Sequence, residues 1–366
     1  MEYLPTFVIT FVSALVCVSL LVPYVHDFAV KIGALQEGSS QHGAGQRLHD
    51  GHMPNIGGLA ILGGFLLALL LGSMVQPTML DAFRVELLAI VVGATFMTLV
   101  GFIDDLWTLP ASVRLAAQCL AAGILVVNGV TIDFITNYFG NSGYVFFGET
   151  LSVMLTLLWV VGFTNAFNFI DGLDGLSSGI AAISSLCLIA VAVQFAGRGA
   201  AILLLSALSG ASLGFLRHNF NPAKIFMGDA GAYTLGYVLA AASVLGALKL
   251  TAAVTVVAPM LILALPVLNI THVTLRRLSQ GVHPAEARND HLHDIIRIKS
   301  GSKRLTVVIL WAMTLSLGVL GMVLSSTPPE LITGTMFGSS ALLASVSAMR
   351  WREVWRDVRR EDSLES

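Results

Sequence analysis

Charged residues are scarce in this sequence, because Lys, Arg, Asp and Glu together make up only 11% of its 366 residues. Soluble domains usually carry roughly 25% charged residues, so this deficit argues against an ordinary soluble enzyme. Cysteine is scarce too, and Cys17, Cys119 and Cys187 lie inside apolar stretches at no spacing typical of a metal site. We therefore expect these three residues to be small core residues and not ligands.

Long hydrophobic runs are abundant, since 55% of the residues are hydrophobic and apolar runs of about 17–25 residues recur along the chain. Backbone groups in lipid must be hydrogen-bonded within the chain, so we expect these runs to be helices. The first run begins at Leu4 with no basic segment before it, which predicts a first span and not a signal peptide. The sequence predicts an all-α polytopic membrane protein. Eleven spans are expected, with ten as the alternative count, at residues 4–26, 55–74, 85–103, 113–130, 151–166, 176–196, 199–216, 230–248, 252–272, 304–325 and 331–349.

Lys and Arg set the orientation of these spans. With the N-terminus outside, 17 of the 20 basic residues fall on inner segments, as the positive-inside rule requires. We predict a cytoplasmic C-terminus, one transmembrane catalytic domain (1–349) and a basic cytoplasmic tail (350–366). That tail is either an interfacial helix or a plain positive-inside anchor. The outer segment 130–147 has two runs of β-branched and aromatic residues around Gly140–Gly143, which predicts a short β-hairpin.

Acids, amides and histidines gather on the predicted inner side. Lys and Arg alone fix the orientation, so the position of these other polar residues is independent support for one cytoplasmic site. They form five clusters, which are Arg47–Gly58, Asp104–Asp105, Asn165–Asp174, Lys224–Asp229 and His283–Asp294.

Asp104 and Asp105 lie at the inner end of the third predicted span. Adjacent residues of a helix point about 100° apart, so two functional carboxylates here have different roles. One carboxylate would face a nucleophile and the other a cation or a lysine. The alternative is an ordinary solvated helix end.

Polar residues recur at every third position at 165, 168, 171 and 174. On a helix this spacing forms a slowly drifting stripe on one face. Amide and carboxylate oxygens are the ligands that Mg2+ prefers. Gly172 and Gly175 are expected to break the helix and to let a ligand approach the backbone closely. The alternative is a helix cap, with Asp174 capping the sixth span.

Asp229 opens the eighth predicted span, either as an N-cap or as the holder of a cation that a diphosphate bridges. Lys224 is a phosphate partner or a plain positive-inside residue. His291 and His293 alone are a weak zinc signal, and together with Arg288 they fit a diphosphate or sugar better.

Taken in order, these clusters resemble the polyprenyl-phosphate N-acetylhexosamine-1-phosphate transferase superfamily, also called glycosyltransferase 4. The resemblance runs from about Arg47 to Asp294. Its motifs are an Asp-Asp pair, an Asn-x-x-Asn-x-x-Asp-Gly-x-Asp-Gly segment, a Gly-Asp pair and a His-rich loop. Two positions depart from the family pattern, because Asp294 follows His293 where the family has a further His, and Arg114 stands where Lys is usual.

The resemblance implies transfer of a sugar-1-phosphate from a UDP-sugar to undecaprenyl phosphate, with release of UMP and the start of a lipid-linked glycan of the cell wall or lipopolysaccharide. Its closest match is the GlcNAc-1-phosphate type. It implies Mg2+, with Mn2+ as a substitute, held by Asp229 with Asn168 as helper. The implied catalytic residues are Asp104, Asp105, Asp171, Asp174, His291 and His293, and the implied substrate-binding residues are Asn165, Asp171, Asp174, Arg114, Arg288, His291, His293, Lys224 and Arg47.

Several alternatives stay open at this point. The donor could be another UDP-N-acetylhexosamine or UDP-MurNAc-pentapeptide, and the reaction could pass through a covalent aspartyl-phosphate. From another class, a secondary transporter also uses broken helices and intramembrane acids, but its sites lie near the bilayer midplane. A CDP-alcohol phosphotransferase would need its acids on a single helix. The expected partners are the two substrates and membrane lipids of the bacterial cytoplasmic membrane, without nucleic acid and with a homodimer left open.

Overall fold

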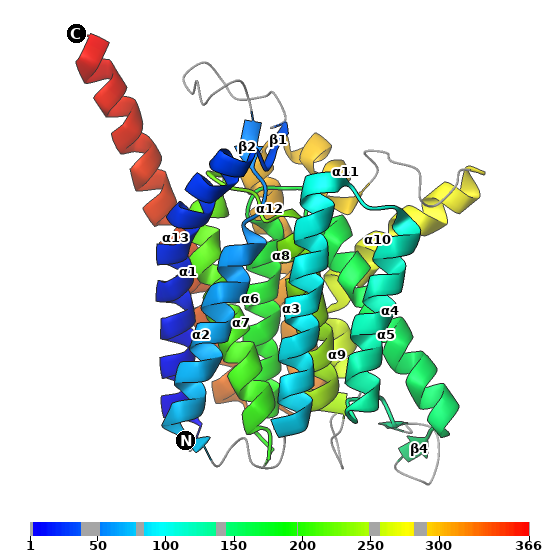
Figure 1. The fold of residues 1–366 in the computed structure, drawn as a ribbon. Helices are drawn as coiled ribbons and strands as arrows, with labels where there is room; N and C mark the ends of the chain where they lie inside the picture. The colour runs from blue at the N-terminus through cyan, green and yellow to red at the C-terminus, as the bar shows by residue number, and fades with distance from the viewer. Residues whose placement is uncertain are drawn as a thin grey trace.

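Helices make up nearly all of the described chain in this computed structural model, and they stand side by side in one bundle (Figure 1). The structure describes residues 3–37, 52–77, 84–136, 144–195, 197–248, 257–281 and 291–365. The helices are α1 (Leu4–Ile32), α2 (Gly58–Val75), α3 (Arg84–Trp107), α4 (Ala111–Val127), α5 (Glu149–Ile170), α6 (Leu176–Ala192), α7 (Gly199–Asn219), α8 (Gly228–Ser243) with its π-helical continuation η3 (Val244–Leu248), α9 (Val257–Ile262), α10 (Ala264–Ser279), α11 (Leu292–Ser300), α12 (Lys303–Leu324) and α13 (Pro329–Glu365).

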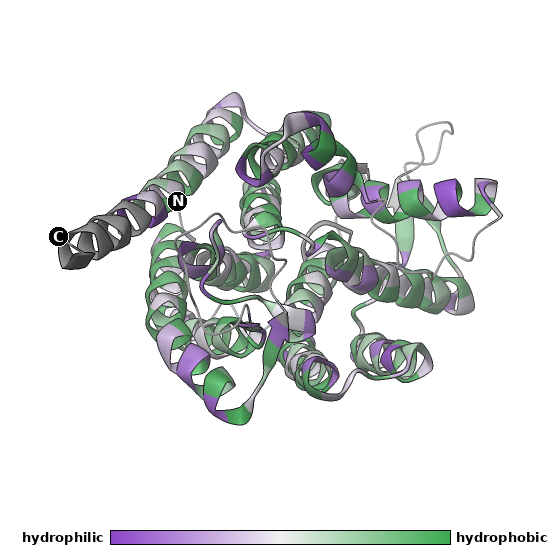
Figure 2. Cartoon of the chain, turned by 90° about the horizontal axis from the view of Figure 1, so that it is seen from above, coloured by the Kyte–Doolittle hydropathy of each residue, from purple (hydrophilic) through white to green (hydrophobic). Residues whose placement is uncertain are grey.

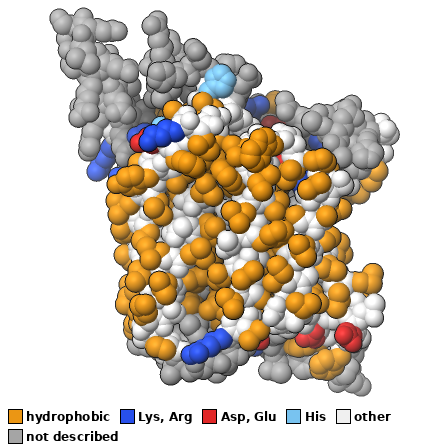
Figure 3. Space-filling model, in the orientation of Figure 1, with side chains coloured by type: hydrophobic (Ala, Val, Ile, Leu, Met, Phe, Trp, Pro, Cys, Tyr) orange, Lys and Arg blue, Asp and Glu red, His pale blue; other side chains and the backbone are white. Residues whose placement is uncertain are grey.

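The length and polarity of these helices identify an integral membrane protein. In the described ranges, seven are long and apolar enough to cross a bilayer: α1, α2, α3, α5, α7, α12 and the first part of α13. Helices α4 and α6 are shorter apolar helices. In Figure 3 hydrophobic side chains cover the middle of the visible face, and charged side chains gather toward its two ends. The predicted all-α polytopic class is therefore confirmed.

Ten of the eleven predicted spans each correspond to one helix, or to α8 with η3. The ninth, predicted at 252–272, was wrong as a single helix. Within its described part, α9 ends at Ile262 and α10 begins at Ala264. Pro266 has no N–H to give to the carbonyl of Ile262, and this missing hydrogen bond favours a break between the two helices.

Two short strand pairs lie at opposite ends of the bundle. Strands β3 (Phe134–Thr136) and β4 (Tyr144–Phe146) pair antiparallel, which confirms the predicted hairpin, whereas its turn lies outside the described residues. Strands β1 (Leu35–Glu37) and β2 (His52–Pro54) pair at the other end and were not predicted. The last helix, α13, continues through the predicted start of the tail and extends past the bundle at the β1–β2 end (Figure 1).

Helix α7 forms the centre of the bundle, and its whole apolar segment is buried. Helix α1 packs along it with a stripe of buried residues that begins at Thr6 and recurs every four positions. Gly210 and Gly214 of α7 lie directly against carbonyl oxygens of α1. Helices in lipid associate through such close contacts of small residues. The view from above shows the helices packed side by side, with hydrophobic residues along each of them (Figure 2).

A second contact of small residues joins α2, α3 and α8 near the β1–β2 end. A Cβ on Gly58 would lie 2.1 Å from the amide nitrogen of Gly231, and a Cβ on Gly101 would lie 2.4 Å from that of Ala230. The chain before α2 also pairs with the chain before α8, because the Gly57 N–H donates to the Phe226 carbonyl at 3.0 Å. These contacts hold the first turn of α8 in a fixed place.

Replacing Gly101 by alanine tests this contact. The added methyl group has no room beside the backbone of Ala230, so we expect the free energy of unfolding to fall by about 1–3 kcal/mol. Gly123→Ala is the matched control, because nothing lies within 4 Å of a Cβ there. Thermal unfolding in nanodiscs measures both variants. Equal stability of Gly101→Ala and the unchanged protein would contradict the packing described here.

Candidate active site

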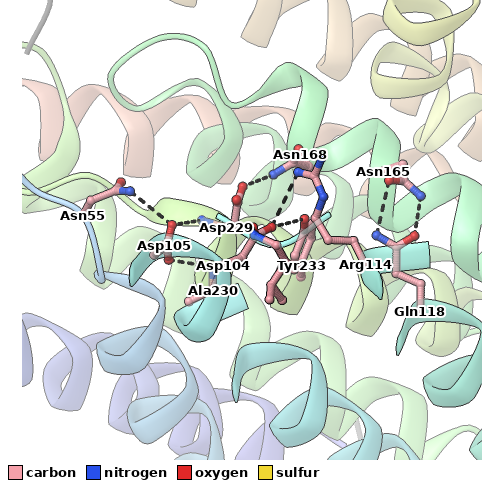
Figure 4. A network of polar contacts seen from close by, with 11 residues as sticks. Asn55, Asp104, Asp105, Arg114, Gln118, Asn165, Asn168, Asp229, Ala230 and Tyr233 are labelled. Carbon is pink, nitrogen blue, oxygen red and sulfur yellow. Dashed lines mark hydrogen bonds and ion pairs between the residues drawn. The ribbon is translucent and has the colours of Figure 1, made fainter. Parts of the chain in front are cut away.

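Polar side chains from α3, α4, α5 and α8 converge at the β1–β2 end of the bundle (Figure 4). Each of them lies within a turn or two of a helix end. Asp104 and Asp105 precede the end of α3 at Trp107, and Asp229 is the second residue of α8. The structure therefore brings together residues from separate segments, all of which the sequence predicts to lie on the inner side.

Asp104 is buried and bound on both carboxylate oxygens. Its Oδ1 accepts the Leu109 N–H at 2.6 Å, and its Oδ2 accepts the Tyr233 hydroxyl at 3.0 Å. The same Oδ2 lies 3.5 Å from Nη1 of Arg114, whose side chain is about one-third exposed. Asp104 thus fixes a partly exposed guanidinium at the edge of the cluster.

Asp105 points to a different partner, as expected for adjacent helix positions. Its Oδ1 accepts the backbone N–H of Asp229 at 2.8 Å, and its Oδ2 accepts that of Ala230 at 3.1 Å. The Asn55 amide also donates to Oδ1, at 3.1 Å. The first N–H groups of a helix have no partner within it, so the Asp105 carboxylate caps α8 from a neighbouring helix. Gly228 precedes this turn with a φ of +71°, a conformation that favours glycine.

Asp229 lies beside two other oxygen-bearing side chains. The Asn168 amide donates to its Oδ1, and the Asp104 carboxyl is close enough to interact with it directly. Two neighbouring carboxylates repel each other unless a proton or a cation lies between them. Of the residues labelled in Figure 4, only Arg114 carries a positive charge. This arrangement fits a bound cation at Asp229, with the amide oxygen of Asn168 available after rotation of the amide.

The donor set fits Mg2+ better than a metal caged by protein alone. Within the described ranges, no group of three His, Cys, Asp or Glu side chains is arranged to hold a metal ion. Mg2+ commonly binds through one or two carboxylates and completes its shell with water and substrate phosphates. A site of this kind would therefore form fully only when a phosphorylated substrate is present.

The four polar positions do not share one helix, because α5 ends at Ile170, in keeping with the helix break predicted at Gly172 and Gly175. Asn165 and Asn168 are helical but have different partners. The Asn165 amide exchanges two hydrogen bonds with Gln118 of α4, at 2.6 and 3.2 Å. This pair ties α5 to the helix that carries Arg114, so Asn165 is placed to position that helix.

Asp171 and Asp174 lie in the turn between α5 and α6. Desolvation raises the pKa of Asp171 from 3.8 to about 7, so near neutral pH this carboxyl can donate as well as accept a hydrogen bond. Asp174 does not cap α6, whose N-cap is Gly175. Its Oδ2 instead accepts the Asn221 amide at 2.8 Å and the Ala223 N–H at 3.2 Å.

Asn221 connects Asp174 to the C-terminal part of the chain. Arg304 of α12 donates from Nε to the Asn221 carbonyl at 3.1 Å and to its side-chain Oδ1 at 3.2 Å. The Arg304 guanidinium also lies 4.5 Å from the centre of the Trp351 ring of α13. Helix α12 is therefore linked through Asn221 to the turn that holds Asp174, and α13 is linked to it through Arg304.

His291 and His293 form a stack over the end of α5. The rings of the two histidines lie 5.2 Å apart and nearly parallel, and Phe169 stacks on His291 at 5.8 Å. His293 is 5% exposed, and a Cβ on Gly172 would lie 2.2 Å from its Nε2. Burial lowers the pKa of His293, although the adjacent Asp294 opposes this shift, so the ring is neutral at physiological pH. The histidines thus lie directly against the turn that carries Asp171.

Three other predicted site residues are not seen in the cluster, namely Lys224, Arg47 and Arg288. Lys224 lies in the chain before α8, and its N–H donates to the His218 carbonyl at 2.8 Å. Arg47 and Arg288 lie outside the described residues. Sequence reasoning missed five polar residues whose partners are distant in the chain, namely Gln118, Asn219, Asn221, Tyr233 and Asn269. For Tyr233 a signal existed, because it follows Asp229 by four positions and so shares its helix face.

Comparison with known proteins identifies similar chains. The model of glycosyl transferase family 4 matches residues 87–247, the segment from α3 to η3 that carries the four converging helices. The probable undecaprenyl-phosphate N-acetylglucosaminyl 1-phosphate transferase of Bacillus subtilis is 33% identical over 87% of this chain and 85% of its own length. The decaprenyl-phosphate N-acetylglucosaminephosphotransferase of Mycolicibacterium smegmatis is 32% identical over 81% and 79%. The phospho-N-acetylmuramoyl-pentapeptide-transferase of Listeria monocytogenes is 32% identical over 66% and 74%.

The different surroundings of Asp105 and Asp229 predict opposite effects on stability. Asp105→Ala leaves the first N–H groups of α8 without their acceptor, so we expect the free energy of unfolding to fall by about 1–2 kcal/mol. Asp229→Asn removes a negative charge beside Asp104, so it should be at least as stable as the unchanged protein when EDTA is present. Thermal unfolding in nanodiscs measures both. Destabilisation by Asp229→Asn alone would refute the capping role of Asp105.

Proposed function

The chain belongs to glycosyl transferase family 4, and from this membership we propose that it transfers N-acetylglucosamine-1-phosphate from UDP-GlcNAc to undecaprenyl phosphate, releasing UMP. The printed names of the Bacillus and Mycolicibacterium relatives support this sugar and a polyprenyl acceptor. The similarity to those two proteins also covers more of this chain than the similarity to the Listeria pentapeptide transferase does. A donor with a MurNAc-pentapeptide is the second candidate.

One observation carries the proposal. Asp229, Asn168 and Asp104 converge beside Arg114, which places cation-binding oxygens next to a phosphate-binding guanidinium. The two substrates are both anions, so their mutual repulsion is the first barrier to reaction. A site that combines a cation with a fixed guanidinium lowers that barrier through positioning and charge stabilisation, which carry most of phosphoryl transfer.

We propose that Asp229 and Asn168 hold Mg2+, with Mn2+ as a substitute. When bound, this ion neutralises charge on the diphosphate and on the departing phosphate. Asp104 keeps Arg114 directed toward the reacting phosphates through their 3.5 Å contact. Arginine suits this task because its planar guanidinium can donate two hydrogen bonds to one phosphate.

The surroundings of the two adjacent acids support direct attack by the lipid phosphate on the β-phosphorus of the UDP-sugar. Both oxygens of Asp104 and both oxygens of Asp105 already accept hydrogen bonds from within the protein. A covalent aspartyl-phosphate would add a bond to phosphorus on an oxygen that already accepts a hydrogen bond, and so would weaken that contact. The lipid phosphate needs no strong base, because the second pKa of a phosphate monoester is about 6.

The remaining predicted residues bind the donor in this proposal. Asp171 can accept or donate to the nucleotide, and Asp174 holds the turn that carries Asp171. His291, His293 and Arg288 would bind the sugar and diphosphate, and Lys224 and Arg47 would provide further positive charge for the phosphates. We infer a cytoplasmic position for this end of the bundle, which the positive-inside pattern of Lys and Arg supports.

The depth of the acids argues against a transporter. Transporter sites lie near the bilayer midplane. Here Asp104, Asp105 and Asp229 lie within a turn of the ends of their helices, at the same end of the bundle as β1 and β2. A headgroup-level site suits a lipid phosphate that approaches sideways from the bilayer.

Transfer by the purified protein tests the proposal directly. We expect release of UMP and a lipid-linked product from UDP-GlcNAc and undecaprenyl phosphate, loss of the activity in EDTA, and recovery with Mg2+ or Mn2+. Asp229→Asn should lower the rate at least about 100-fold, because it removes the main ligand of the cation.

Glu86→Gln is the control, because Glu86 lies in the first turn of α3, at the end opposite to Asp104. It should transfer at the rate of the unchanged protein. A rate that EDTA leaves unaltered, or equal losses in the two variants, would contradict the proposed site. A preference for UDP-MurNAc-pentapeptide would replace the proposed donor by the second candidate.

A further inference from the structure

Asn269 of α10 is a fully buried amide that joins three parts of the chain. It is 0% exposed and lies between the end of α5 and the start of α11. Its Oδ1 accepts the backbone N–H of Leu292 at 2.9 Å. Its Nδ2 lies 3.4 Å from the Phe169 carbonyl oxygen and 3.4 Å from Nδ1 of His291.

Two of these contacts fix the direction of the amide. The Leu292 N–H can only donate, so the atom that faces it must be the oxygen. The Phe169 carbonyl can only accept, so the atom that faces it must be the nitrogen. Both backbone partners therefore support the same assignment of Oδ1 and Nδ2, and a flipped Asn269 amide would lose both contacts.

The direction of the amide decides which nitrogen of His291 carries hydrogen. A neutral imidazole has one N–H and one acceptor nitrogen. Because Nδ1 of His291 faces the donor end of Asn269, Nδ1 must accept and the hydrogen must be on Nε2. The stacking of His291 between Phe169 and His293 holds the plane of the ring in this orientation.

We propose that Asn269 is a positioning residue that fixes the Nε2–H tautomer of His291, so that this ring presents a hydrogen-bond donor to the diphosphate or sugar of the bound UDP-sugar. This role rests on the proposed function. A diphosphate offers only acceptor oxygens, and a ring with hydrogen on Nδ1 would turn a lone pair toward them. A correctly placed N–H strengthens its bond as negative charge develops during transfer, so its main effect is on kcat.

The tautomer can be measured without any activity. Protein labelled with 15N-histidine is studied by solid-state NMR in nanodiscs, at a pH well above the ordinary histidine pKa of about 6.5. The His291 signals are identified by their loss in His291→Gln. We expect hydrogen on Nε2 and a bare Nδ1, whereas hydrogen on Nδ1 overturns the proposal.

Asn269→Asp then changes the tautomer with little change in shape. Its carboxylate still accepts the Leu292 N–H, but it also accepts from His291, so the hydrogen should move to Nδ1. We expect kcat to fall about 10–100-fold, the range typical of partners that orient a functional histidine, with a smaller change in KM for the UDP-sugar. An unchanged kcat together with a changed tautomer overturns the proposed role.

A double-mutant cycle separates this role from general damage. If Asn269 acts through His291, Asn269→Asp has little further effect in the His291→Gln protein, whereas independent losses that multiply overturn the proposal. Asn128→Asp is the matched control, because Asn128 donates only locally to the Ile124 carbonyl near the C-terminus of α4. It should retain full activity. Absence of transfer by the unchanged protein counts against the proposed function, while the nitrogen spectrum still decides the tautomer.

Discussion

The contact of the Asp105 carboxylate with the first N–H groups of α8 is the constraint on which the site depends. It joins α3 to α8 where close glycine contacts already bring their backbones together. The same contact sets Asp229 beside Asp104 and brings Tyr233, one turn further along α8, to the Asp104 carboxylate. The proposed cation site, the Arg114 guanidinium and the cap of α8 are therefore held by one set of contacts between α3 and α8.

The membrane explains why this arrangement lies at a helix end. A lone carboxylate costs about 2.5–3.5 kcal/mol at the centre of a bilayer helix and less near its surface. At the end of the bundle, carboxylates can accept hydrogen bonds from free helix N–H groups and from water, and these bonds stabilise their negative charge. In the proposed reaction, the same position would let a lipid-borne phosphate and a water-soluble nucleotide reach one site from two different phases.

Local features of the fold could be predicted from the sequence, but the partners of the polar residues could not. The length of the apolar runs predicted the spans, and two runs of β-branched and aromatic residues predicted the β3–β4 hairpin. The role of Asp105 depends on an amide 124 positions away, and Asn165 is tied to Gln118 across 47 positions, so neither pairing leaves a periodic signal. The break between α5 and α6 could be predicted from Gly172 and Gly175, and the structure differs only in extending α5 to Ile170, beyond the predicted span end at residue 166. Asn269 was missed because a lone amide in an apolar run resembles any other buried polar residue.

The central claim is that carboxylate and amide groups from separate segments form one cation site at the β1–β2 end of the bundle. An anomalous-difference map of crystals grown with Mn2+ and UDP-GlcNAc tests it most directly. We expect one strong Mn2+ peak within bonding distance of Asp229 and Asn168, in contact with the diphosphate. A peak at the middle of the bundle, or a diphosphate bound away from Asp229, would contradict it.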